Sequence, residues 1–97
     1  MEIKDWNDIA RWVMDDLGAI MWQQIIPDLP PLSSDNIIIV IEKTIVNYNL
    51  FFCDKTHDYR IRRMAVLQFT SQSAAKLAAD KIEDCLRSHL CSDSLNQ

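Results

Sequence analysis

Hydrophobic residues recur at helical spacing in the first quarter of the chain. One apolar stripe returns every three or four positions, which predicts an amphipathic helix over residues 5–24. Asp5 can cap this helix, and Asp8 places a second negative charge in its first turn. Two tryptophans, Trp12 and Trp22, do not fall on the stripe, so we expect them to project toward the side that should be polar.

Three prolines end the helical pattern in residues 25–35, because proline cannot continue a helix and favours extended backbone in the residue before it. The run Ile37–Ile41 that follows is entirely β-branched and unbroken, which is typical of a strand buried on both faces. A second strand is expected within Thr44–Cys53, where Asn47-Tyr48-Asn49 could turn or bulge the chain.

The segment Tyr59–Phe69 predicts a long strand with alternating faces. Strict alternation sends Ala65 and Leu67 to one face, and Met64 and Val66 to the other. The same alternation places Arg63 on the apolar face, near its outer end.

Residues 74–90 predict a final helix with an alanine-rich buried stripe, capped by Ser71 or Ser73. Residues 91–97 are polar and are expected to fray. The alanines would let this helix approach a sheet closely.

These elements predict a single α+β domain over residues 1–97, with strands within 36–69. Short links favour an antiparallel sheet of three to four strands, with the N-terminal and C-terminal helices packed on one face. The Ile37–Ile41 run sends apolar side chains to the other face as well. We therefore expect the loop at 25–35, or another subunit, to cover that second face.

Composition excludes several classes of protein. The single glycine, Gly18, rules out glycine-rich phosphate loops, and a net charge of −4 is opposite to the basic excess of most nucleic-acid binders. Three cysteines do not make a disulfide framework. The N-terminus lacks a signal-peptide pattern, and the longest apolar run is far shorter than a membrane span. We expect a cytoplasmic protein that does not bind a membrane.

Candidate chemistry is sparse. Cys53 and His57, with Cys85 and His89, supply the ligand types of tetrahedral zinc, although the spacing matches no zinc-finger pattern. A buried cysteine, a turn histidine and a helix end explain the same residues without a metal. A Cys–His nucleophile needs a third group to orient it, and the sequence shows none. The carboxylate pair Asp15-Asp16 shows no sign of the burial that shifts a pKa. We expect no enzyme activity, no cofactor, no metal and no small-molecule substrate.

The residues expected at protein contacts come from surplus apolar surface and from the one basic cluster. Tryptophan is enriched at interface hot spots, although either tryptophan could instead fold back under the proline loop. The basic cluster could contact acidic protein or DNA, or could serve only as a soluble strand end. The predicted interface residues are Trp12, Trp22, Ile38, Val40, Arg60, Arg62 and Arg63.

The strand, polar loop and alanine-rich helix of residues 62–86 resemble a known family. The sequence Val66-Leu67-Gln68-Phe69, a short Thr-Ser-Gln-Ser loop, and a helix ending Ala79-x-x-Ile82-x-x-x-Leu86 are similar to phage tail-terminator or tail-completion proteins, also called minor capsid or neck proteins. The resemblance implies a ring, possibly a hexamer, that joins the tail tube to the head connector in the virion without catalysis. It also implies passing contact of the arginines with DNA in a lumen. It assigns no functional residue individually.

A second hypothesis is a small acidic inhibitor or adaptor, such as an anti-defence protein of a mobile element. Asp8, Asp15 and Asp16 would form an acidic face that blocks a basic partner surface.

Overall fold

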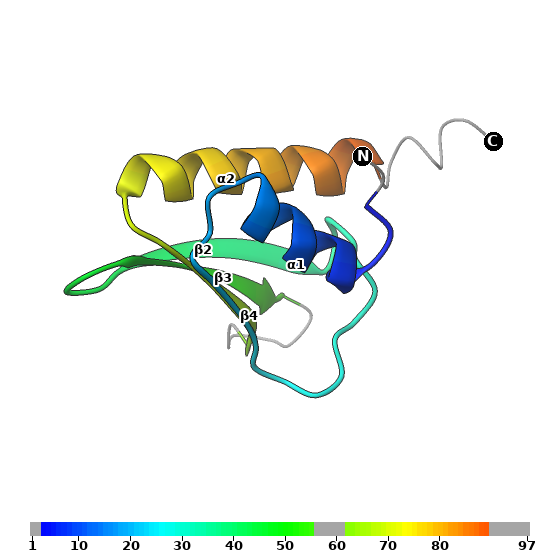
Figure 1. Cartoon of the computed structure of the whole chain (residues 1–97). Coiled ribbons are helices and arrows are strands. Elements are labelled where there is room, and N and C mark those ends of the chain that lie inside the picture. Colours follow the sequence, from blue (N-terminus) through cyan, green and yellow to red (C-terminus); the bar gives the residue numbers. More distant parts are fainter. Residues whose placement is uncertain (1–2, 56–61, 90–97) are drawn as a thin grey trace.

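The computed structural model of the chain describes residues 3–55 and 62–89, with side chains described as far as residue 87. Two helices and four strands make up this part of the chain (Figure 1). Their bounds in chain order are α1 Trp6–Asp15, β1 Met21–Gln24, β2 Ile37–Lys43, β3 Tyr48–Asp54, β4 Arg62–Phe69 and α2 Gln72–Asp84, which continues into the π-helical turn η1 Cys85–His89.

The four strands form one antiparallel sheet in the order β1-β4-β3-β2. Both helices lie on the same side of this sheet in Figure 1. The predicted α+β fold, with an N-terminal helix, a small antiparallel sheet and a C-terminal helix, is therefore confirmed. We call the face under the helices the inner face and the opposite one the outer face.

Helix α1 begins as the sequence predicts but ends nine residues earlier than expected. The Asp5 side chain accepts from the Asp8 backbone N–H, and the Asp8 carboxylate accepts from the Asp5 N–H in return, which closes a capping box. The helix ends at Asp15, so the predicted helix over 5–24 is wrong in its second half. Aspartates at a helix C-terminus oppose the helix dipole, and no basic side chain in the last turn offsets them.

The chain reverses direction at Gly18, whose φ is +82°. This left-handed conformation is easily reached only by glycine. Beyond it, the Ala19 N–H donates to the Val13 carbonyl at 3.0 Å, which ties the reversal to the helix end. The next residues run along β4 as strand β1. Trp22 therefore lies in a strand, not in a helix.

Three aromatic rings form the centre of the inner core. The Trp6 ring meets the Phe52 ring edge-on at 5.2 Å between centroids, and Trp22 lies 6.0 Å from Phe52 and 6.3 Å from Trp6. The Trp6 Nε1–H donates to the Pro30 carbonyl at 2.7 Å, which fastens the proline segment to α1. Side chains of that segment also pack on the inner core, namely Ile26, Leu29 and Leu32.

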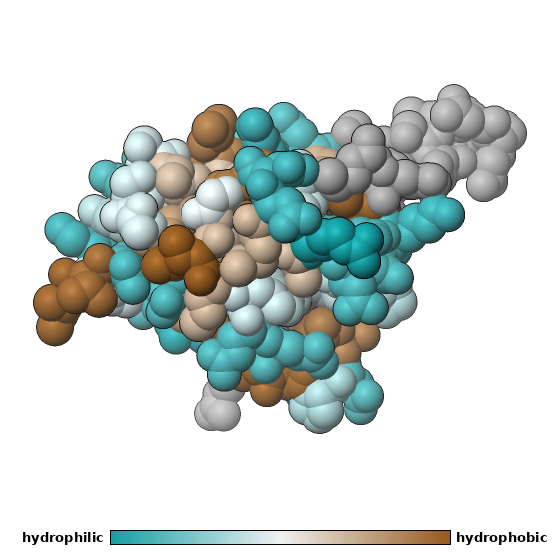
Figure 2. Space-filling model, in the orientation of Figure 1, coloured by the Kyte–Doolittle hydropathy of each residue, from teal (hydrophilic) through white to brown (hydrophobic). Residues whose placement is uncertain are grey.

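Strands β2 and β3 form a hairpin with only Ile45 and Val46 at its tip. The Thr44 N–H donates to the Asn47 carbonyl, and the Asn47 N–H donates to the Thr44 hydroxyl, each at about 2.9 Å. The second strand predicted within 44–53 thus begins at Tyr48, after a turn that contains neither glycine nor asparagine at its tip. The tip projects from the domain and is hydrophobic in Figure 2.

Strand β4 contains a bulge that changes which side chains face the core. Phe52 stands opposite Ala65, but the next residue of β3, Cys53, stands opposite Arg63, so Met64 is the extra residue. Met64 joins the inner core instead of the outer face. Strict alternation through this point was therefore a wrong prediction, and Arg63 moves to the outer face.

Helix α2 is capped by Ser71, whose hydroxyl accepts from the Ala74 N–H at 3.2 Å. Of the two serines that the sequence offered, Ser71 is therefore the cap. Ala75, Ala78 and Ala79 are buried against the sheet, as predicted. The helix begins two residues before the predicted 74–90, and Leu90 and the tail over 91–97 lie outside the described residues.

Replacing Gly18 with alanine should destabilise the fold. A Cβ at this position meets no atom within 4 Å, so the cost comes from the positive φ alone. We expect a loss of roughly 1 to 2 kcal/mol in the free energy of unfolding, measured by urea denaturation. Gly18→Asn should lose less, because asparagine tolerates this conformation better. An alanine variant as stable as the original chain would contradict the proposed role of Gly18.

Candidate interaction surface on the outer sheet face

The outer face of the sheet carries a cluster of apolar side chains from all four strands. Three of its residues are buried and three are partly exposed. We call this cluster the outer patch; it consists of Phe51, Cys53 and Val66, with Met21, Ile38 and Val40 packed against them.

Strand register explains why these residues meet. Val40 on β2 stands opposite Phe51 on β3, which stands opposite Val66 on β4. One row away, Ile38 stands opposite Cys53, which stands opposite Arg63. Side chains on neighbouring strands in such rows are close enough to pack directly.

Arg63 lies across the outer patch. Its guanidinium sits 4.1 Å from the centroid of the Phe51 ring, in the geometry of a cation–π contact. The same group is 2.9 Å from the Glu42 carboxylate on β2. Both charged side chains are about half exposed, at 51% and 46%, so the ion pair is a weak surface one. Its effect is to hold the arginine over the aromatic ring.

Asn49 adds an unsatisfied polar atom to this face. It occupies the row beside the patch, opposite Glu42 on one side and Gln68 on the other. Its Oδ1 is buried and has no hydrogen-bond donor among the described residues.

No described helix or loop covers the outer patch. Both helices lie on the inner side in Figure 1, and Ile26, Leu29 and Leu32 of the 25–35 loop pack on the inner core, whereas Ile25 is exposed. Of the two covers that the sequence suggested, the loop therefore packs mainly on the other face of the sheet.

The structure brings three predicted interface residues together on the outer face, namely Ile38, Val40 and Arg63. Arg62 is exposed, next to Arg63 in the strand and opposite Asp54, so its side chain belongs to the other face. The predicted basic cluster is therefore divided between two faces. Arg60 lies outside the described residues.

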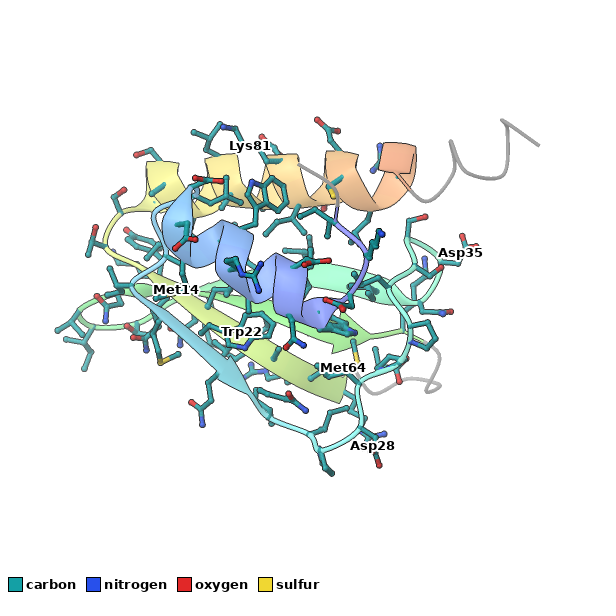
Figure 3. The ribbon with its side chains drawn as sticks, turned by 45° about the vertical axis from the view of Figure 1, so that its right-hand side comes forward. Met14, Trp22, Asp28, Asp35, Met64 and Lys81 are labelled. Carbon is teal, nitrogen blue, oxygen red and sulfur yellow. The ribbon has the colours of Figure 1, made fainter. Side chains whose placement is uncertain are left out.

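Trp12 and Trp22 do not belong to the outer patch. Both are partly buried and pack against the inner core, and Figure 3 shows Trp22 beneath α1. The prediction that they project toward a polar side is wrong. Trp22 changes position because β1 replaces the end of the predicted helix.

The two described members of the predicted zinc group are also separated. Cys53 belongs to the outer patch, whereas Cys85 packs against the inner core. His57 and the His89 side chain lie outside the described residues. Within the described part of the chain, no group of three or more metal-ligating side chains occurs.

Two contributors to this surface were missed by the sequence reasoning. Phe51 was not named as an interface residue, although it alternates with Leu50 and Phe52 along an apolar strand. Glu42 was missed because its partner Arg63 is 21 positions away and reaches the outer face only through the bulge. A local sequence signal existed for Phe51 but not for the ion pair.

Asp8, Asp15 and Asp16 do not form a single free acidic face. Asp8 is used in the capping box, and its hydrogen bonds to the backbone of Lys4 and Asp5 help to lower the pKa of its carboxyl. Asp15 and Asp16 are exposed at the other end of α1.

No protein-family model, curated protein or solved structure matches this chain. Within the described residues, none of the helices has the length and hydrophobicity needed to cross a membrane.

The raised pKa values of two cysteine thiols predict that the folded protein loses stability at alkaline pH. Burial raises the pKa of Cys53 above its ordinary 9.0, with Arg63 opposing the rise, and burial also raises the pKa of Cys85. The unfolded chain therefore releases these protons at a lower pH than the folded chain. Their contribution is fully present below about pH 9 and is lost as the pH rises through the folded pKa values.

Urea unfolding at a series of alkaline pH values tests this expectation. Cys53→Ala should show a shallower decline in stability above pH 9 than the original chain, because one raised pKa is removed. Cys85→Ala serves as the matched variant on the inner side. Identical slopes for all three proteins would contradict the assignment.

Proposed function

We propose that this protein is a non-enzymatic assembly subunit that binds other protein chains through its outer sheet face. One observation carries the proposal: an apolar cluster of six side chains lies on a sheet face that no described element covers. Contiguous apolar patches on a domain surface mark interaction sites.

We assign the assembly to the head–tail junction of a phage, where the chain would act as a tail-terminator or joining subunit. The support is the resemblance of residues 62–86 to that family, together with the order of helix, sheet and alanine-rich helix. In this proposal the subunits form a ring, with a hexamer as the expected number. The outer patch then lies against a neighbouring protein of the junction.

Arg63 serves this contact as an interface residue, not as a DNA ligand. Its guanidinium is already held between the Phe51 ring and the Glu42 carboxylate. Arginine stacked on an aromatic ring is common at protein interfaces. Passing contact with DNA in a lumen would fall to other basic side chains.

The acidic-inhibitor alternative has less support. Asp8 is occupied in capping α1, which leaves Asp15 and Asp16 as the exposed members of the suggested acidic face. Two adjacent carboxylates give little of the charge complementarity that such an inhibitor needs.

The paired substitution Ile38→Thr and Val40→Thr tests the outer patch. Threonine keeps the β-branched shape that suits a strand but removes apolar surface. Binding to the tail-tube or head-connector protein encoded in the same genome should weaken about tenfold or more, measured by calorimetry. Thermal unfolding shows whether the variant stays folded.

Met14→Gln is the matched control, because Met14 is a partly exposed apolar residue on α1, on the other side of the sheet. It should leave binding unchanged. Binding that survives the double threonine variant, or no binding of the original chain to either protein, would refute the proposal.

A further inference from the structure

Strand β2 is an edge of the sheet, and the backbone groups along its free side point away from β3. The Lys55 N–H donates to the Asn36 carbonyl, and the Thr44 N–H donates to the Asn47 carbonyl. In an antiparallel pair these bonds involve every second residue, so the even-numbered residues of β2 are bonded to β3. The odd-numbered ones present their N–H and C=O groups at the edge, namely Ile37, Ile39, Ile41 and Lys43.

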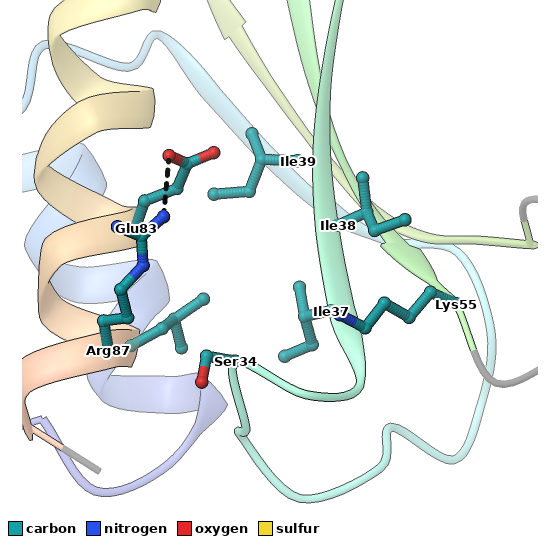
Figure 4. A pocket seen from close by; sticks show the side chains of 8 residues that line it. Ser34, Ile37, Ile38, Ile39, Lys55, Glu83 and Arg87 are labelled. Carbon is teal, nitrogen blue, oxygen red and sulfur yellow. Dashed lines mark ion pairs between the residues drawn. The ribbon is translucent and has the colours of Figure 1, made fainter. Parts of the chain in front are cut away.

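This edge lacks the usual protection against pairing with another strand. Natural edges carry proline, bulges or inward charges, whereas β2 pairs with β3 over seven residues without a register shift. Its charged residues, Glu42 and Lys43, stand only at the end. The side chains of Ile37 and Ile39 point toward α2, as Figure 4 shows. Among the described strands, none pairs with the free side of β2.

Helix α2 presents a polar stripe above this edge. At about 100° per residue, the four side chains of the stripe fall within about 60° of one another. They line two hollows between α2 and β2, one of about 210 Å³ beside Ile37 and Ile39 and one beside Ile41 and Lys43. In chain order the stripe consists of Gln72, Lys76, Glu83 and Arg87.

We propose that two copies of this chain pair through their β2 edges, antiparallel and related by a twofold axis at Val40. The free groups of odd-numbered residues then bond to one another, with Ile37 opposite Lys43 of the partner subunit. All seven residues of β2 are used, and the two sheets join into one of eight strands. The other edge, β1, has only four residues, so pairing β2 with it would leave part of β2 unpaired.

One pair of opposite charges in the α2 stripe meets under this symmetry, although Glu83 also lies 3.9 Å from Arg87 of its own copy, as Figure 4 shows. Lys76 lies at the Lys43 end of the edge and Glu83 at the Ile37 end. A twofold axis through the middle of β2 brings each Lys76 toward the partner's Glu83. Lys43 also approaches that carboxylate, because it stands opposite the partner's Ile37. Each contact occurs twice in the pair.

In the same register, the hairpin tip of one copy, Ile45 and Val46, approaches the second copy. Ile45 is 100% exposed and Val46 is 78% exposed, which is unusual for large aliphatic residues held in a hydrogen-bonded turn. Continued pairing carries the tip past Ile37 of the partner subunit toward its residues 34–35. Ser34 and Ile37 line the 210 Å³ hollow, which also reaches Leu86. The tip therefore approaches a hollow of mixed apolar and polar lining on the second copy.

This inference rests on the proposed assembly function. Because a twofold contact is isologous, a hexameric ring that contains it consists of three such pairs joined by a second kind of contact. It uses the edge and the α2 side of the sheet, and it shares Ile38 and Val40 with the outer patch, because both residues lie on β2. The stripe and tip variants alter no residue of the outer patch, so they test the pairing separately.

Charge-reversal variants test whether Lys76 of one copy contacts Glu83 of the second copy. Lys76→Glu and Glu83→Lys should each weaken self-association about tenfold, since each change places like charges together at two symmetric contacts. The double variant should restore it, because the pairs are re-formed with exchanged signs. Lys81→Glu is the control, because Lys81 points away from the sheet in Figure 3. Sedimentation equilibrium of the full chain measures the dissociation constant.

Amide hydrogen exchange tests the register. As concentration rises, the odd-numbered β2 amides should become protected, whereas the even-numbered ones are already bonded to β3 and should change little. The amides of β1 act as an internal control on the opposite edge.

The tip is tested by Ile45→Ser, which alters a side chain that makes no contact needed for folding. Self-association should weaken, whereas Leu77→Ser on the exposed side of α2 should leave it unchanged.

A chain that stays monomeric at every concentration, a double variant that fails to restore association, or unprotected odd-numbered amides in an associated form would each overturn the β2 pairing. Self-association that the stripe and tip variants leave unchanged would also overturn it, and the outer-patch proposal is then still judged by binding to the head or tail proteins. Association that follows the stripe and tip variants, without binding to head or tail proteins, would uphold the pairing and refute the proposed function.

Discussion

The contact of Trp6 and Trp22 with Phe52 determines how this small domain is arranged. It joins α1, β1 and the central strand β3 at one point, and the Trp6 indole also holds the proline segment through Pro30. Trp22 can reach this point only because the chain reverses at Gly18 and returns as a strand. Aromatic rings bury large areas, so three of them supply much of the apolar contact available to so short a chain.

This arrangement places all of the helical cover on one side of the sheet. The proline segment is fastened to the same side, so it cannot fold under the outer face. Phe51, Cys53 and Val66 are nevertheless largely buried, because they pack on one another and Arg63 lies over Phe51. The outer patch thus combines three buried residues with three partly buried ones, namely Met21, Ile38 and Val40.

Local sequence signals predicted the parts of the fold that depend on local physics. The Asp5 cap, the β-branched run of β2 and the alanine face of α2 each follow from neighbours in the chain. The end of α1 was missed because Ile20 and Met21 continue the helical period by coincidence, although Gly18 marked a stop. The bulge at Met64 has no local signature, since it arises from the register with β3. The outer patch was therefore only half predictable: Ile38 and Val40 followed from their strand, whereas Arg63 required the bulge.

Strand β2 lies at an edge of the sheet, although its apolar composition is typical of a central strand. A strand that is apolar on both faces normally lies in the middle of a sheet, but β2 lies at its edge. Its inner side chains pack on the inner core beneath α2, and its outer side chains, Ile38 and Val40, belong to the outer patch. Within the described residues the backbone edge of β2 also has no neighbouring strand, and a side chain cannot satisfy a row of N–H and C=O groups. Another strand can, and a second copy of β2 has the matching length, charge order and apolar tip.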